Sequence, residues 1–78
     1  MPTLLNINGY RFFFYVNDHS PAHIHIEKAE GTAKFLLNPV EIVKSKHFNS
    51  SEIHEIREII IQNLDFFKNK WDEYHNNN

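Results

Sequence analysis

Three of the six histidines, His19, His23 and His25, lie within seven positions of one another. Asp18 directly precedes them, and Pro21 restricts the backbone between the first and second histidine. Imidazole titrates near neutral pH and binds metal ions, and a carboxylate can share a metal ion with it. No other segment of the chain gathers so many groups of this kind, so we expect the functional site here.

The histidine segment leads directly into a predicted strand at residues 23–28. Alternation along a strand places His23 and His25 on one face, and Ile24 and Ile26 on the other. Because the isoleucines belong to the core, the two imidazoles should lie together on the outer face. Their Cα atoms would be about 6–7 Å apart, which is close enough for both side chains to reach one ion.

Further strands are predicted on both sides of this one, giving a three- to four-stranded antiparallel sheet. Asn8-Gly9 is a strong signal for a two-residue hairpin turn, because both positions tolerate positive φ. Such a turn sets Thr3 opposite Phe14. The strands are expected at residues 3–7, 10–16, 23–28 and 32–37, with 40–43 as a fourth crossing or an edge, so that the sheet spans 3–43.

One long helix is predicted over residues 50–75. Asn49 is its expected N-cap and Glu52 completes a capping box. Apolar residues then recur three and four apart, which indicates one face packed on a sheet. This stripe comprises Ile53, Ile56, Ile60, Leu64, Phe67, Trp71 and Tyr74. The chain is therefore predicted to be one α+β domain over residues 1–78, with the helix on one face of the sheet and a frayed tail at 76–78.

Composition and charge argue against several classes of protein. A formal net charge of −2 argues against a protein held on nucleic acid by its overall charge. The absence of cysteine excludes disulfides, thiolate chemistry and cysteine-based zinc sites. The sequence has neither an apolar run of membrane-spanning length nor a basic-then-apolar leader, so we expect a cytoplasmic protein that does not associate with membranes.

The histidine segment supports two kinds of chemistry. Asp18, His19, His23 and His25 could bind a divalent metal ion, and no other cofactor is predicted. Alternatively, the three histidines could act as general acid and base in the cleavage of a phosphoester, as in a ribonuclease. A plainer interpretation is that the histidines line a polar sheet face and bond to their neighbours.

The predicted outer face also suits RNA. It would carry Arg11, Phe13, Tyr15 and Lys34, and exposed aromatic rings stack on unpaired bases while cations hold phosphate. The alternative is that these aromatic side chains are covered by another element or a second subunit. A homodimer is one way to supply such cover, since apolar side chains remain that one sheet and one helix would leave exposed. These are Phe13, Ile59, Ile61 and Phe66.

Nearly the whole chain resembles a family of small bacterial proteins, the domain of unknown function number four-one-six-zero. The resemblance rests on the pattern Asp18-His19-x-Pro21-x-His23-x-His25-Ile26, on Gly31 in the turn before the next strand, on Ala33 in that strand, and on a C-terminal helix ending near Trp71. Members often carry a second proline where this chain has Ala22. They are often encoded beside another small protein, in an arrangement suspected of being a toxin–antitoxin system, so the resemblance implies a cognate protein partner and a nucleic-acid target.

Three functions follow as alternatives. The leading prediction is a small cytosolic bacterial protein of toxin–antitoxin type that binds a partner protein, and RNA as a further target, through the histidine face. The second is a metal- or histidine-dependent phosphoester hydrolase. The third is an interaction module without catalysis.

Overall fold

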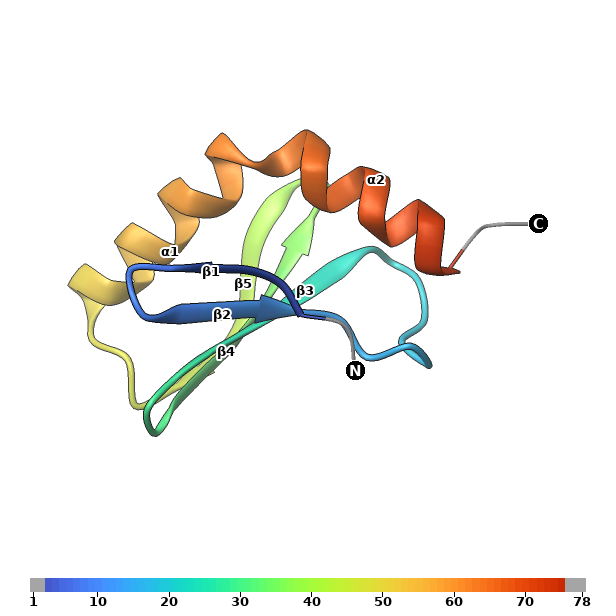
Figure 1. Ribbon diagram of the computed structural model, residues 1–78. Helices are drawn as coiled ribbons and strands as arrows, with labels where there is room; N and C mark the ends of the chain where they lie inside the picture. The colour runs from blue at the N-terminus through green and yellow to red at the C-terminus, as the bar shows by residue number, and fades with distance from the viewer. Residues whose placement is uncertain (1–2, 76–78) are drawn as a thin grey trace.

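The computed structural model describes residues 3–75, which form a five-stranded antiparallel sheet with two helices across one side (Figure 1). The strands follow one another across the sheet in chain order. The elements are β1 (Thr3–Ile7), β2 (Tyr10–Phe13), β3 (His23–Lys28), β4 (Gly31–Leu37), β5 (Val40–Lys46), α1 (Ser50–Gln62) and α2 (Leu64–His75). The α+β class and the antiparallel pairing are confirmed, but the sheet has five strands where three to four were predicted. The tail predicted at 76–78 lies outside the described residues.

The first hairpin has the predicted turn but a different register. Asn8 and Gly9 have φ values of 54° and 84°, as a type I′ turn requires. Thr3, however, pairs with Phe13 and not with Phe14, because the register shifts between Thr3 and Leu5. The prediction of Thr3 opposite Phe14 was therefore wrong by one residue, which is the length of a β-bulge.

The second strand ends at Phe13, three residues before the predicted end at residue 16. The cause is a turn over residues 15–18. The Asp18 N–H donates to the Tyr15 carbonyl oxygen at 3.0 Å, and the Asp18 carboxylate accepts the Tyr15 N–H at 2.9 Å. These bonds satisfy backbone groups that would otherwise continue the ladder, so the chain leaves the sheet at this point.

The sheet extends beyond the predicted limit at residue 43, because β5 continues to Lys46. Lys34 pairs with Lys44, and Thr32 pairs with Lys46. These lysines were predicted to lie in a polar connection. Their charge is compatible with a strand because β5 is the last strand of the sheet, and charged side chains are common on such edges.

The single helix predicted over 50–75 is two helices that meet at Asn63 and arch over the sheet (Figure 1). The Asn63 side-chain amide donates to the Ile59 carbonyl oxygen at 2.8 Å, and the Asn63 backbone N–H donates to the same carbonyl at 3.1 Å. An asparagine that bonds back to the preceding turn competes with regular helical geometry. The predicted start is confirmed, since Asn49 and Glu52 form a complete capping box.

Most of the predicted helical stripe packs into one core with the inner face of the sheet. Tyr74 is an exception, with 42% of its surface exposed, whereas Ile59 is buried. Phe13 and Ile59 are covered within the chain itself, and the predicted need for a second subunit to cover them was wrong; Ile61 and Phe66 stay exposed. Within residues 3–75, neither helix has the length and apolar character needed to cross a bilayer.

Candidate functional site

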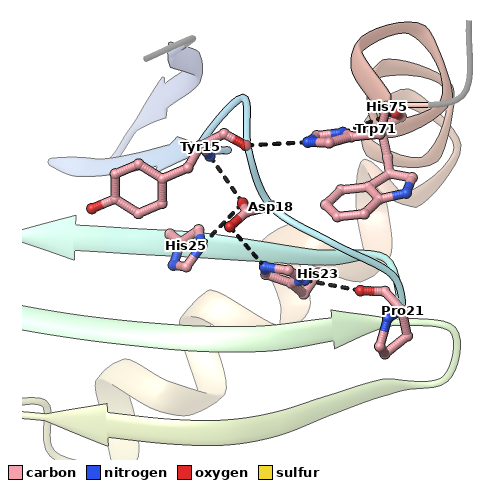
Figure 2. A network of polar contacts seen from close by, with 7 residues as sticks. All are labelled: Tyr15, Asp18, Pro21, His23, His25, Trp71 and His75. Carbon is pink, nitrogen blue, oxygen red and sulfur yellow. Dashed lines mark hydrogen bonds and ion pairs between the residues drawn. The ribbon is translucent and has the colours of Figure 1, made fainter.

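The structure brings Asp18, His23 and His25 together at the start of β3 (Figure 2). Nε2 of His23 lies 3.3 Å from Oδ1 of Asp18, and Nε2 of His25 lies 3.2 Å from Oδ2. The three side chains are mostly buried, with exposed fractions of 13%, 7% and 18% for Asp18, His23 and His25. One carboxylate thus bridges two imidazoles on the outer face of the sheet.

The alternation predicted for β3 explains why the two imidazoles meet. Ile24 and Ile26 are buried in the core, while the rings of His23 and His25 lie 5.1 Å apart on the opposite face. Asp18 reaches them from the turn after β2. His19 is exposed and lies outside this group, so the structure brings together three of the four predicted metal ligands.

The C-terminal helix holds the turn that carries Asp18. Nε2 of His75 lies 3.1 Å from the carbonyl oxygen of Tyr15, and the Trp71 ring stacks on the His75 ring at 3.9 Å (Figure 2). Trp71 also contacts His23, with ring centroids 5.1 Å apart. Sequence reasoning treated Trp71 only as a core anchor and did not assign His75 any role, because nothing local to α2 signals a contact 60 residues away.

Charge and burial oppose one another at Asp18 and at His25. Burial would raise the pKa of Asp18, but the Tyr15 N–H and the two imidazoles outweigh it and hold the pKa below its ordinary value. Burial lowers the pKa of His25 despite the nearby Asp18 carboxylate, and His23 and Lys34 lower it further. Near neutral pH, Asp18 is therefore ionised and His25 is neutral.

A row of side chains runs from this cluster across the outer face. Cross-strand pairing sets Phe13 beside His25, His25 beside Lys34, and Lys34 beside Lys44. A hollow of about 450 Å³ opens along the row, and Tyr15 and Lys46 also line it. Lys44 and Lys46 were not predicted as site residues. Strict alternation from Val40 and Ile42 would place them on the inner face, and the register shift between Lys34 and Phe35 turns them to the outer face, which no local signal shows.

The other two predicted binding residues are less available. The guanidinium of Arg11 forms an ion pair with Glu27 at 2.6 Å and lies 4.2 Å from the centre of the Phe13 ring. Phe13 also stacks on His25 and is only 4% exposed, so its ring has no free face for a base. Tyr15, at 44% exposure, is the aromatic residue of this face that a ligand can reach.

Comparison with known families places the chain. A family model described as a domain of unknown function (DUF4160) matches residues 9–72. The chain belongs to this family. The DUF4160 match contains the Asp18–His23–His25 cluster and the lysines of the hollow, whereas β1 and His75 fall outside it. Searches of the curated proteins and of the solved structures found no match.

Proposed function

We propose that the protein binds single-stranded RNA through the outer face of its sheet. The observation that supports this is the convergence of Lys34, Lys44 and Lys46 on one hollow that Tyr15 and His25 also line. Among residues 3–75, none of these lysines forms an ion pair with a carboxylate. Unpaired ammonium groups hold phosphate, and an exposed tyrosine beside them can stack on a base whatever its identity.

The distribution of charge supports RNA more than the net charge of −2 suggests. Six of the ten acidic residues lie in α1 and α2, against three of the eight basic residues. The negative charge therefore concentrates in the helical layer, on the far side of the sheet from the hollow. On the outer face, Glu27 is paired with Arg11, Asp18 lies between His23 and His25, and Glu41 is exposed on β5. A phosphate backbone that follows the outer face avoids most of the repulsion.

Binding of a short fluorescein-labelled RNA, followed by fluorescence anisotropy in EDTA, tests this proposal. Three phosphate contacts to a single strand give a slope of log K against log salt near −2, since each contributes about −0.7. Lys34→Ala or Lys44→Ala should weaken binding and make the slope less steep by about 0.7 each. Lys68→Ala removes the same charge from α2 and should leave the slope unchanged.

Two results would contradict RNA binding at this face. One is a wild-type protein that gives no anisotropy change, or a change that does not depend on salt. The other is a Lys68→Ala variant that loses as much affinity as Lys34→Ala, which would mean that the RNA follows overall charge and not the hollow.

The family resemblance extends the proposal to a toxin–antitoxin pair in which a cognate small protein opposes the RNA-binding chain. Expression of the chain alone should then arrest growth, and expression together with the neighbouring gene should restore it. Lys34→Ala combined with Lys44→Ala should relieve the arrest if RNA is the target. Normal growth of cells that express the folded wild-type chain alone would count against the toxin role.

Cleavage of the bound RNA is a second candidate function, favoured by the position of His25. This imidazole is bonded to Asp18 through Nε2 and lines the hollow beside Lys34. Its Nδ1 could accept the proton of a ribose 2′-hydroxyl, whose oxygen would attack the adjacent phosphorus while the 5′-oxygen leaves with a proton from water. Labelled RNA should then yield fragments ending in a 2′,3′-cyclic phosphate, and His25→Ala should abolish them. RNA that stays intact with the wild-type protein would eliminate this candidate.

A further inference from the structure

The two ring nitrogens of His23 both face oxygen atoms, and this determines where its proton must lie. Nδ1 of His23 lies 2.9 Å from the carbonyl oxygen of Pro21. Because a carbonyl oxygen only accepts hydrogen bonds, Nδ1 must carry the hydrogen. In a neutral imidazole, Nε2 then has only a lone pair, and it faces the Asp18 carboxylate at 3.3 Å. Two acceptors at this distance repel one another unless a cation lies between them, either a proton on Nε2 or a metal ion.

His25 also faces the Asp18 carboxylate, so three potential metal ligands lie close together. Nε2 of His25 also faces Asp18, at 3.2 Å, and the ligand atoms of the three residues all lie within 4.8 Å of one another. A tetrahedral ion with bonds of about 2.0–2.1 Å separates neighbouring ligand atoms by about 3.3–3.4 Å. The two nitrogen-to-oxygen distances are of this size, but they end on different oxygens of Asp18, Oδ1 for His23 and Oδ2 for His25, so the side chains would close in slightly around one ion.

The geometry points to a binding site for a divalent transition-metal ion, of the Zn²⁺ or Fe²⁺ class, at Asp18, His23 and His25. Two imidazoles and one carboxylate form a recurrent ligand set for these ions, and the set leaves at least one coordination position for water or a substrate. Mg²⁺ and Ca²⁺ fit less well, because both prefer shells made of oxygen atoms.

The surroundings of the three residues match those of metal ligands. A ligating histidine usually donates its second ring N–H to a carbonyl or carboxylate, which fixes the ring and its tautomer. The Pro21 carbonyl accepts from His23 in this way, and the Tyr15 N–H holds the Asp18 carboxylate. His75 in turn fixes the Tyr15 carbonyl. Asp18 and His23 are thus positioned by backbone contacts that do not depend on the ion.

The metal site stands independently of RNA binding. The proposed RNA contacts use the lysines of the hollow, whereas the ion would be held by groups at its end, and only His25 belongs to both. Measurement of RNA binding in EDTA and of metal binding without RNA keeps the two proposals separate. Either one can fail while the other holds.

Titration of EDTA-treated protein with Zn²⁺, followed by calorimetry, tests the site, and Co²⁺ absorption reports its ligands. We expect one ion per chain and a rise in Tm on addition of Zn²⁺. Asp18→Asn and His23→Gln should each weaken binding by more than about 100-fold, the upper range for the loss of a supporting contact. His54→Gln, an exposed histidine on α1, is the matched control and should bind as the wild type does.

A conservative variant separates lost ligation from lost folding. His23→Cys replaces one ligand with a thiolate, which also binds Zn²⁺, and should retain binding that His23→Gln lacks. The proposal is overturned if neither Zn²⁺ nor Co²⁺ binds the folded wild-type protein stoichiometrically, in which case the cation on His23 is a proton. It is also overturned if His54→Gln weakens binding as much as His23→Gln.

Discussion

Gly31→Ala should destabilise the protein by about 2 kcal/mol, because the ring of Phe48 occupies the space that a Cβ would need. A Cβ at residue 31 would lie 2.3, 2.6 and 2.8 Å from three atoms of that ring. Overpacking of this kind costs about 1–3 kcal/mol, and a clash with three atoms of a rigid ring belongs in the upper half of that range. Against this cost, alanine stabilises the protein by about 0.4–1 kcal/mol, because it restricts the conformations of the unfolded chain.

This loss of stability should arise from the Phe48 ring and not from the backbone conformation of Gly31. Phe48 packs edge-on against Tyr10, with ring centroids 5.9 Å apart, so the ring cannot withdraw without loosening a core contact. For a domain of this size, about 2 kcal/mol corresponds to a fall in Tm of roughly 8–16 °C. Urea denaturation of Gly31→Ala, followed by circular dichroism, measures the free energy of unfolding directly.

A double-mutant cycle decides whether the clash is the cause. In a Phe48→Ala background the ring is gone, so Gly31→Ala should cost little or become stabilising, and the two substitutions should couple by at least about 1 kcal/mol. An unchanged Tm for Gly31→Ala would refute the reasoning. The same cost in both backgrounds would also refute it, because the penalty would then arise from something other than Phe48.

Two further predictions concern the hydrogen bonds of α1. Asn49→Ala removes a side-chain oxygen that accepts the Glu52 N–H at 2.8 Å. In urea denaturation this substitution should lower the free energy of unfolding by about 1 kcal/mol, whereas Asn49→Asp, which keeps an acceptor oxygen, should retain most of the wild-type stability. Burial, followed by the hydrogen bond to Glu55, raises the pKa of Tyr10 from 10.0 to about 12. The folded state therefore disfavours the phenolate, and stability that is complete below pH 10 should decline between pH 10 and about 12. Tyr10→Phe should reduce this decline, and an identical alkaline profile for wild type and variant would contradict the assignment.

Local sequence patterns predicted the features that depend on backbone geometry alone. Strand alternation requires His23 and His25 to share a face once Ile24 and Ile26 are buried. The Asn8-Gly9 turn follows from positive φ, and the capping box follows from the spacing of Asn49 and Glu52. None of these features needs a distant partner, so the sequence contains the whole cause.

Features that depend on competition between local and distant contacts were mispredicted. The apolar stripe continues through Asn63, so periodicity cannot show that its side chain bonds back to Ile59 and divides the helix. The register shift between Thr3 and Leu5 pairs Thr3 with Phe13, and the turn at 15–18 ends β2. Whether Phe13 needed a second subunit depended on Arg11 and His25, which cover its ring from within the chain.

The sequence by itself determined which face of β3 carries the imidazoles, because a period of two permits no other arrangement around a buried isoleucine pair. Only the tertiary structure decided what those imidazoles meet. It set Asp18 between His23 and His25, left His19 outside, and brought Lys44 and Lys46 beside His25 through the pairing of β4 with β5. The physical reason is that a one-residue register shift moves side chains to the other face of a strand, and that His75 holds the turn from the far end of the chain; residue spacing within one strand shows neither.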